Sequence, residues 1–295
     1  MTGPTAAVLG AGRMGSAMAE RLAGQGVAVV VYNRTPDRAT ALAGKIGAAV
    51  ATTPAEAASR ADVVITMVAD DAAVRDLFDG PDGIAAGLRR GAVAVDMSTV
   101  LPDTIRAVAP AVRARGAGVL DGPVSGSVSS TLAGELTIMV GGEADDLERA
   151  RPILDHLARR VFHLGPLGTG AVMKLAVNTL IFGLNGAVAE GLVLAERNGI
   201  DRALAYEILA SSAAGAPMVG YKRANFVEPE STPVAFSLAL AEKDLRLIRE
   251  LAEASDTAMP QATVNLDTIQ AAERSMGQDL DFALVAGHLR QEGRR

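Results

Sequence analysis

Residues 6–15 read AAVLGAGRMG, a short apolar run that leads directly into the pattern G-x-G-x-x-G. The run Ala6–Leu9 predicts a buried strand, and Arg13–Gly24 predicts a helix that starts inside the pattern. The first glycine would make the tight turn, the second would let the backbone approach a pyrophosphate, and the third would let the helix pack close to the strand. The N–H groups at the helix start would then face phosphates. The predicted dinucleotide-binding turn therefore consists of Gly10, Ala11, Gly12, Arg13, Met14 and Gly15.

The tip of the next predicted strand, Val27–Tyr32, indicates which dinucleotide is bound. A carboxylate that binds the ribose hydroxyls is expected there for NAD, but the sequence reads Asn33-Arg34-Thr35. Asn33 has no negative charge to repel a 2′-phosphate, Arg34 can pair with it bidentately, and Thr35 can donate its hydroxyl. These residues predict NADP(H) as the cofactor. The alternative interpretation makes Arg34 a solvated side chain and Thr35 only a helix N-cap.

The first half of the chain alternates short apolar runs with helical stretches. Continuous apolar strands separated by helices indicate a parallel-dominated sheet covered on both faces, which is a Rossmann-type α/β domain. The further predicted strands are Ala48–Ala51, Val63–Val68, Val93–Val95, Val119–Leu120, Leu136–Val140 and Val161–Leu164. The predicted helices between them are Pro36–Ala43, Pro54–Ser59, Asp71–Leu88 and Pro102–Arg115.

The second half contains helical patterns only. We expect residues 1–165 to form the NADP-binding Rossmann domain and residues 166–295 to form an all-α domain for substrate binding and dimerisation, entered by a long interdomain helix. That helix, Gly170–Asn198, would have about 29 residues and a length of roughly 43 Å. The other predicted helices are Asp201–Ala214, Pro233–Ser255, Pro260–Met276 and Asp281–Arg290.

The predicted long helix is apolar around nearly its whole circumference, so it has to be covered on all sides. A helical domain of this size can hardly cover it alone, and we expect a homodimer through the helical domain. The helix is also long enough to cross a bilayer. However, Lys174, Asn178 and Asn185 within it, and the lack of a flanking basic cluster, favour a buried helix and no membrane association.

Composition excludes several classes of function. The net charge of −6 argues against a nucleic-acid partner, because phosphate binding requires clustered Lys and Arg. The absence of cysteine excludes disulfides, thiolate metal sites and a cysteine nucleophile. His156, His163 and His288 lack metal-ligand spacing, so no metal is expected. The N-terminus has no signal-peptide pattern, and we expect a cytoplasmic protein.

Lys174 is the lone charged residue between Thr169 and Ala189. An unpaired ammonium in apolar surroundings is costly, and burial lowers the pKa of a lysine toward neutrality, which suits a general acid/base. Asn178 follows at i+4, on the same face of the helix, where it could hydrogen-bond both the ammonium and a substrate oxygen. The pattern alone leaves a snorkelling or salt-bridged structural lysine equally open.

Five ordered segments of the chain together closely resemble the β-hydroxyacid dehydrogenase family, which includes 3-hydroxyisobutyrate dehydrogenase, glyoxylate/succinic semialdehyde reductase and 6-phosphogluconate dehydrogenase. The resemblance covers nearly the whole chain and implies a Rossmann domain, a long interdomain helix, an all-helical C-terminal domain and commonly a dimer. The segments are the glycine turn, Asp96-Met97-Ser98-Thr99, Asp121-Gly122-Pro123-Val124-Ser125-Gly126, Gly168–Asn178 and Lys243-Asp244.

The resemblance implies a role for each matching residue. Lys174 would protonate the carbonyl oxygen as hydride arrives from the nicotinamide, with Asn178 beside it. The substrate carboxylate would be held by Ser125, Gly126 and Ser127. Lys243 would contact the substrate or the cofactor. The nicotinamide end would be bordered by Val68, Ala69 and Thr99. Family members usually have a second glycine after Gly126, where this chain has Ser127 followed by further hydroxyl residues, so the identity of the substrate is left open.

The main hypothesis is an NADP(H)-dependent oxidoreductase that interconverts a small carbonyl acid, such as a semialdehyde, and its hydroxyacid. One alternative is an NADPH-dependent imine reductase, which has the same fold and resembles this chain at Val234–Leu238 but usually lacks a lysine at the position of Lys174. The other alternative is a dinucleotide-binding module without catalysis.

Overall fold

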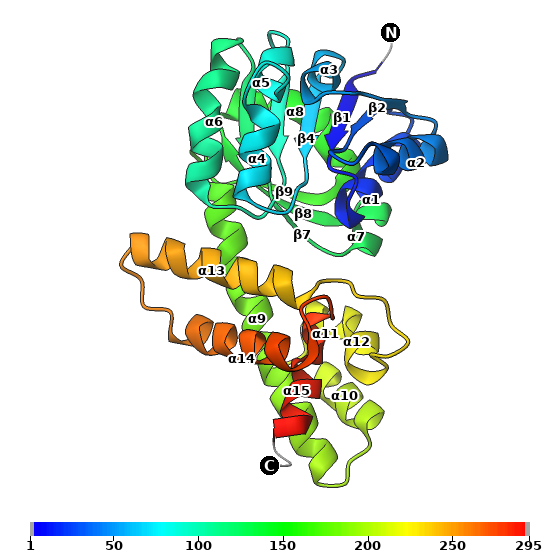
Figure 1. Ribbon diagram of the computed structural model, residues 1–295, viewed down its shortest axis with the longest axis vertical. Coiled ribbons are helices and arrows are strands. Elements are labelled where there is room, and N and C mark those ends of the chain that lie inside the picture. Colours follow the sequence, from blue (N-terminus) through cyan, green and yellow to red (C-terminus); the bar gives the residue numbers. More distant parts are fainter. Residues whose placement is uncertain (1–2, 293–295) are drawn as a thin grey trace. The chain divides into compact units, whose positions relative to one another are not determined.

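The computed structural model describes residues 3–292 and divides into two compact units, Met1–Lys174 and Leu175–Arg295 (Figure 1). Within the described residues the first unit contains a sheet of nine strands. The strands are β1 Thr5–Leu9, β2 Ala28–Tyr32, β3 Ala49–Val50, β4 Val63–Thr66, β5 Val93–Asp96, β6 Gly118–Asp121, β7 Val124–Ser125, β8 Leu136–Gly142 and β9 Ala158–His163.

The first six strands are parallel and lie in the order β3-β2-β1-β4-β5-β6. The strand order reverses between β1 and β4, and in open α/β sheets ligands bind beyond the carboxyl ends of the strands at such a switch point. β8 then pairs antiparallel with β6 and with β7, and β9 pairs parallel with β8. The carboxyl ends of β1, β4, β5 and β6 consequently share one edge of the sheet.

Helices cover both faces of this sheet. α1, α2 and α8 pack on one face, where Val8 and Ile65 are fully buried, whereas α3, α4, α5 and α6 pack on the other, around Leu9 and Val64 (Figure 1). Because both faces are buried, the strands are continuously apolar instead of alternating. The helices are α1 Arg13–Gly24, α2 Pro36–Ile46, α3 Pro54–Ser59, α4 Asp71–Phe78, α5 Ile84–Gly87, α6 Pro102–Ala114, α7 Val128–Ala133 and α8 Ala144–Leu157.

The second unit is helical. Its core contains the rings of Phe182, Phe236 and Phe282, and the pairs that involve Phe282 meet edge to face. Lys222 and Asp281 form a salt bridge of 2.7 Å, and both side chains are buried. The helices are α9 Thr169–Arg197, whose first turns belong to the first unit, α10 Arg202–Ser211, α11 Pro217–Tyr221, α12 Arg223–Val227, α13 Leu238–Ala254, α14 Pro260–Met276, the short 3₁₀ helix η1 Phe282–Leu284 and α15 Val285–Glu292.

The predicted fold class, a Rossmann-type domain followed by a helical domain with a long helix, is confirmed. α9 has 29 residues and differs by one residue at each end from the predicted helix Gly170–Asn198.

Two predicted helices differ most from the observed bounds. The predicted helix Asp71–Leu88 is broken into α4 and α5, because Gly80 has a left-handed φ of 80° and a Cβ on Gly83 would lie 2.2 Å from a backbone oxygen. The predicted helix from Pro233 begins only at Leu238, where the Ser237 hydroxyl accepts the N–H of Leu240. The helices α7, α8, α11 and α12 were not predicted.

Among the described residues, one helix, α9, is long and apolar enough by length and composition to cross a membrane. Two of its polar side chains form hydrogen bonds inside the second unit. The Asn185 side chain donates to the carbonyl of Phe282, and the buried Asn178 donates to a carboxylate on α13. These bonds are typical of the core helix of a folded domain.

Candidate functional site

The glycine turn lies between the end of β1 and the start of α1, as predicted. Gly10 has a φ of 113°, and a Cβ on Gly10 would lie 2.2 Å from the carbonyl oxygen of Met67. A Cβ on Gly15 would lie 1.9 Å from the carbonyl oxygen of Gly10, so the helix packs closely on the turn. A Cβ on Gly12 would meet open space, and Gly12 and Arg13 are exposed. Two glycines are therefore required for packing, and the middle one leaves room for a ligand to approach the backbone.

Asn33 links the tip of β2 to this turn. Its Oδ1 accepts the N–H of Ala11 at 2.9 Å, and its Nδ2 donates to the carbonyl oxygen of Thr35 at 3.0 Å. The neighbouring Arg34 and Thr35 are exposed. Thr35 precedes α2 without a capping bond from its side chain. Among the described residues, Arg34 forms no salt bridge, and its exposed guanidinium is available to an anion. Asn33 thus has a structural role, the bridging of β2 and the glycine turn, that the sequence did not predict. Arg34 and Thr35 are exposed to solvent beside the turn.

The residues predicted to border the nicotinamide lie at the carboxyl ends of two adjacent strands. Val68 and Ala69 follow β4, and Thr99 follows β5. The backbone N–H of Val68 donates to the Ser98 hydroxyl at 3.0 Å, which joins the two loops. Val68 also approaches the glycine turn, since its Cγ1 would be 3.3 Å from a Cβ on Gly10. The structure therefore places these loops beside the glycine turn at one edge of the sheet.

A buried carboxyl group lies beneath these loops. Oδ1 of Asp96 accepts the hydroxyls of Thr66 at 2.6 Å and Ser98 at 2.8 Å, whereas its Oδ2 is buried without a hydrogen-bond partner within the described residues. Burial raises the pKa of Asp96 to about 6, and the charge of Asp121 on the next strand adds to the increase. Although the sequence motif contains Asp96, its position under both loops was not predicted.

Asp121, at the end of β6, holds the start of the helix that carries Lys174. Its Oδ1 accepts the N–H of Gly168 and its Oδ2 accepts the N–H of Ala171, each at 2.7 Å. Burial raises the pKa of the Asp121 carboxyl, and the N–H donors partly offset this increase. Gly170 fits closely here, because a Cβ on it would lie 2.2 Å from the carbonyl oxygen of Met139. Lys174 follows one turn later and is half-buried.

The predicted carboxylate site forms a short strand and turn. Ser125 ends β7, and Gly126 has a φ of 145°. The Ser127 hydroxyl accepts the N–H of Ser130 and therefore caps α7. α7 packs against α1, where the Thr131 hydroxyl lies 3.8 Å from the Met14 sulfur. The hydroxyl-rich segment after Gly126 thus contacts the helix that follows the glycine turn.

In the second unit, three predicted residues form one polar cluster. Asn178 on α9 donates through Nδ2 to Oδ2 of Asp244 at 2.7 Å, and both side chains are buried. Lys243 pairs through Nζ with Oδ1 of the same carboxylate at 2.7 Å. Asp244 therefore orients both Asn178 and Lys243. The adjacent Lys243-Asp244 pair in the sequence was the signal for this arrangement, although the bond to Asn178 could not be predicted.

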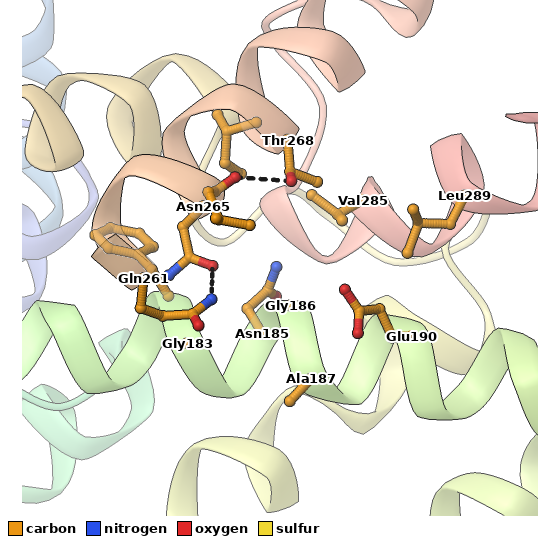
Figure 2. A pocket seen from close by; sticks show the side chains of 13 residues that line it. Gly183, Asn185, Gly186, Ala187, Glu190, Gln261, Asn265, Thr268, Val285 and Leu289 are labelled. Carbon is orange, nitrogen blue, oxygen red and sulfur yellow. Dashed lines mark hydrogen bonds between the residues drawn. The ribbon is translucent and has the colours of Figure 1, made fainter. Parts of the chain in front are cut away.

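The second unit also contains a pocket of about 380 Å³ between α9, α14 and α15 (Figure 2). Gly183, Gly186 and Glu190 line it from α9, and Gln261 and Asn265 line it from α14. No residue that the sequence predicted for catalysis or cofactor binding lines this pocket. Within residues 3–292 there is also no group of three or more acidic or histidine side chains that could hold a metal ion.

Two family profiles together match most of the chain. Residues 5–165 match the NAD binding domain of 6-phosphogluconate dehydrogenase, and residues 168–289 match the NAD-binding domain of NADP-dependent 3-hydroxyisobutyrate dehydrogenase. These two matches correspond to the Rossmann part and the helical part of the chain.

Individual relatives are similar over nearly the full length. The chain is 33% identical to the chloroplastic glyoxylate/succinic semialdehyde reductase 2 of Arabidopsis thaliana, over 94% of this chain and 77% of that protein. It is also 33% identical to the NAD-dependent L-serine dehydrogenase of Pseudomonas aeruginosa, over 95% of each. The solved structure of 3-hydroxyisobutyrate dehydrogenase from Mycobacterium tuberculosis with L-serine superposes with a TM-score of 0.84 at 31% identity, covering 97% of this chain and 99% of that one. The chain therefore belongs to the β-hydroxyacid dehydrogenase family of nicotinamide-dinucleotide-dependent oxidoreductases.

Proposed function

We propose that the protein is an NADP(H)-dependent oxidoreductase that interconverts a small carbonyl acid of the semialdehyde type and its hydroxyacid, with Lys174 as the general acid/base. The observation that carries the proposal is the anchoring of α9 by Asp121. Asp121 ends β6, next to β5 in the sheet, so the helix that bears Lys174 starts at the same edge as the glycine turn and the Val68 and Thr99 loops.

The glycine turn fits a dinucleotide. The open space at Gly12 and the exposed start of α1 would accept the pyrophosphate, because backbone N–H groups and the helix dipole favour an anion there. Arg34 and Thr35 would bind the 2′-phosphate of NADP(H). When bound, the nicotinamide ring supplies the hydride in reduction and accepts it in oxidation.

Lys174 would move the proton. In the direction of reduction its Nζ donates a proton to the carbonyl oxygen of the substrate, and in oxidation the neutral amine takes the proton of the hydroxyl group. Asn178 lies one helical turn further on. Because its Nδ2 donates to Asp244, the side chain is oriented with Oδ1 as the acceptor for an ammonium or a substrate hydroxyl.

The substrate carboxylate would be held at Ser125, Gly126 and Ser127. Hydroxyl groups and backbone N–H groups in a glycine turn are suitable donors to a carboxylate. The Ser127 hydroxyl accepts the N–H of Ser130 and also lies within hydrogen-bond distance of the hydroxyls of Ser129 and Ser130, at 2.7 and 3.1 Å. Lys243 would contribute positive charge for the substrate or the cofactor, with its ammonium oriented by Asp244.

Replacement of the proposed acid/base tests this function. We expect Lys174→Met to lower kcat by about 10²- to 10⁴-fold on a panel of small semialdehydes, followed by NADPH absorbance, while NADPH still binds with near-normal Kd. Lys45→Met is the matched control, because Lys45 pairs with Glu20 on the surface and its removal should leave kcat unchanged. Near-normal turnover by Lys174→Met would refute the mechanism. A cyclic imine is included in the panel, and turnover of the imine alone would favour the imine reductase alternative.

We also propose that two copies associate through the helical unit. Large apolar side chains are exposed on α9, α10 and α14, and burying them against a second copy would remove this apolar surface from water. They are Leu180, Leu194, Leu204, Ile208 and Val264.

A further inference from the structure

Asp96 and Asp121 are neighbours at the edge of the sheet where the proposed cofactor site lies. The sheet register pairs Asp96 at the end of β5 with Asp121 at the end of β6. Their exposed fractions are 1% and 2%. Neither side chain can reach solvent, and the proposed chemistry requires neither as a proton carrier. Two buried carboxyl groups are costly to keep in a protein interior, so a role specific to this place is expected.

The two carboxyl groups bind different parts of the proposed site. Asp96 accepts the Ser98 hydroxyl, and this hydroxyl in turn accepts the N–H of Val68. One carboxyl oxygen therefore connects the loop after β5 with the loop after β4. Asp121 accepts two backbone N–H groups from the start of α9 and no side-chain donor in the described hydrogen bonds. It therefore sets the position of the first turn, from which Lys174 follows on the same helix.

We propose that Asp96 and Asp121 form a pair of positioning residues, in which Asp96 fixes the loops at the nicotinamide end of the cofactor and Asp121 fixes the helix that presents Lys174. The inference rests on the proposed function. It assigns the two residues separable effects, since the loops that Asp96 holds would contact the cofactor, whereas the helix that Asp121 holds would carry the proton donor.

The hydrogen-bond geometry distinguishes how the two sites respond to an asparagine. All the donors to Asp96 meet Oδ1, namely the hydroxyl of Thr66 and the hydroxyl and N–H of Ser98. An asparagine with its carbonyl oxygen at that place keeps all three bonds. The donors to Asp121 meet both oxygens, so an asparagine there can keep only one of the two bonds to α9.

The test uses four variants of the full-length protein and two measurements, the Kd of the preferred nicotinamide dinucleotide by calorimetry and kcat with a semialdehyde. Asp96→Asn should change both values by less than about threefold. Ser98→Ala, which breaks the link between the two loops, should raise the dinucleotide Kd about tenfold. Asp121→Asn should lower kcat about tenfold and leave the dinucleotide Kd unchanged.

Arg106→Ala is the control for the Asp121 variant. The Arg106 guanidinium donates to the carbonyl of Leu167, just before α9, and has no described bond to the Asp121 carboxylate. Its loss should leave kcat within about twofold of the wild-type value. Circular dichroism and the thermal midpoint identify any variant that fails to fold. If Asp121→Asn does not fold, Asp121→Glu replaces it. The longer glutamate side chain should displace the start of α9 and lower kcat by the same factor.

The inference is overturned if Ser98→Ala leaves the Kd unchanged, or if Asp121→Asn retains full kcat or weakens dinucleotide binding as much as it lowers kcat. A failure of the proposed function is visible in the wild-type protein itself, as an absence of dinucleotide binding or of turnover. The two failures are therefore distinguishable.

Discussion

At the scale of single residues, the proposed preference for NADP(H) depends on Arg34. The residue is exposed at the tip of β2, and the carboxylate that would exclude a 2′-phosphate is absent from Asn33-Arg34-Thr35. The similarity to an NAD-dependent L-serine dehydrogenase shows that family resemblance does not decide between the two dinucleotides. The preference for NADP(H) therefore has to be tested on the side chain itself.

We expect Arg34→Ala to raise the KM for NADPH about tenfold or more, because a charge-assisted bidentate contact with the 2′-phosphate is lost, and to change the KM for NADH by less than about twofold. Steady-state kinetics with each dinucleotide measures both effects. Arg60→Ala serves as the control, since Arg60 pairs with Glu56 before β4, at the opposite edge of the sheet. An equal change for NADPH and NADH would remove the assignment of NADP(H).

Asp96 makes the stability of the protein depend on pH. Burial raises its pKa to about 6 in the folded protein, above the value near 4 of an unfolded chain, so the folded state binds this proton more tightly. Its stabilising contribution is fully present below about pH 4 and is lost as the pH rises through 6. The largest change this shift allows is about 3 kcal/mol in the free energy of unfolding.

The measurement compares wild type with Asp96→Asn by urea denaturation at several values between pH 4 and pH 7. Asparagine does not titrate, so the wild type should lose stability relative to the variant over this range, with the difference levelling off above pH 7. The comparison with the variant largely cancels the titration of Asp121, whose pKa is also raised. A difference that stays constant from pH 4 to pH 7 would show that Asp96 does not titrate there.

At the scale of elements, the sequence predicted most strands and the longest helix because their signals are local. The predicted apolar runs Ala6–Leu9 and Val63–Val68 lie next to glycine, aspartate or a helix cap, and β1 and β4 form there, although β4 ends at Thr66. α9 was predicted to within one residue because a continuous apolar pattern ends at Asn198-Gly199, where Gly199 adopts a φ of 86°.

Other elements lack such a signal. α8 has many charged residues and contains a proline, Pro152, so its sequence does not have a clear helical pattern. In the structure, its buried face consists of apolar residues that include Ile153, Leu154 and Leu157. The break between α4 and α5 depends on Gly83 fitting against a backbone carbonyl, which helical periodicity does not reveal.

The candidate site shows the same division between local and long-range information. The glycine turn and the Lys174–Asn178 spacing are local patterns, and the sequence predicted both. The bonds from Asp121 to Gly168 and Ala171 span 47 and 50 residues, and the bond from Asn178 to Asp244 spans 66. Such pairings are set by the order of the strands and the packing of α9 against α13. The family motifs contain these residues, but the motifs do not indicate which of them form hydrogen bonds with each other.

At the scale of the whole molecule, the surface of α9 predicts a dimer. Leu180, Ala187 and Leu194 are spaced seven residues apart, so they share one face of the helix, and all three are exposed. The exposed fractions of the two leucines are 68% and 67%, in a helix that is otherwise rich in apolar residues. Gly183 and Gly186 of the same helix line the pocket between α9, α14 and α15 (Figure 2) and are not part of this leucine face. Burying two such faces against each other removes apolar surface from water in each copy.

We expect a mass of about twice 30.2 kDa by size-exclusion chromatography with light scattering at micromolar concentration. The double variant Leu180→Lys/Leu194→Lys should shift the mass toward that of one chain, because an interface cannot bury two unpaired ammonium groups without a large cost. Val50→Lys places one charge on an exposed apolar position of the edge strand β3 and should leave the mass unchanged. A wild-type protein that is monomeric, or a double variant that remains fully dimeric, would show that this face of α9 is not the interface.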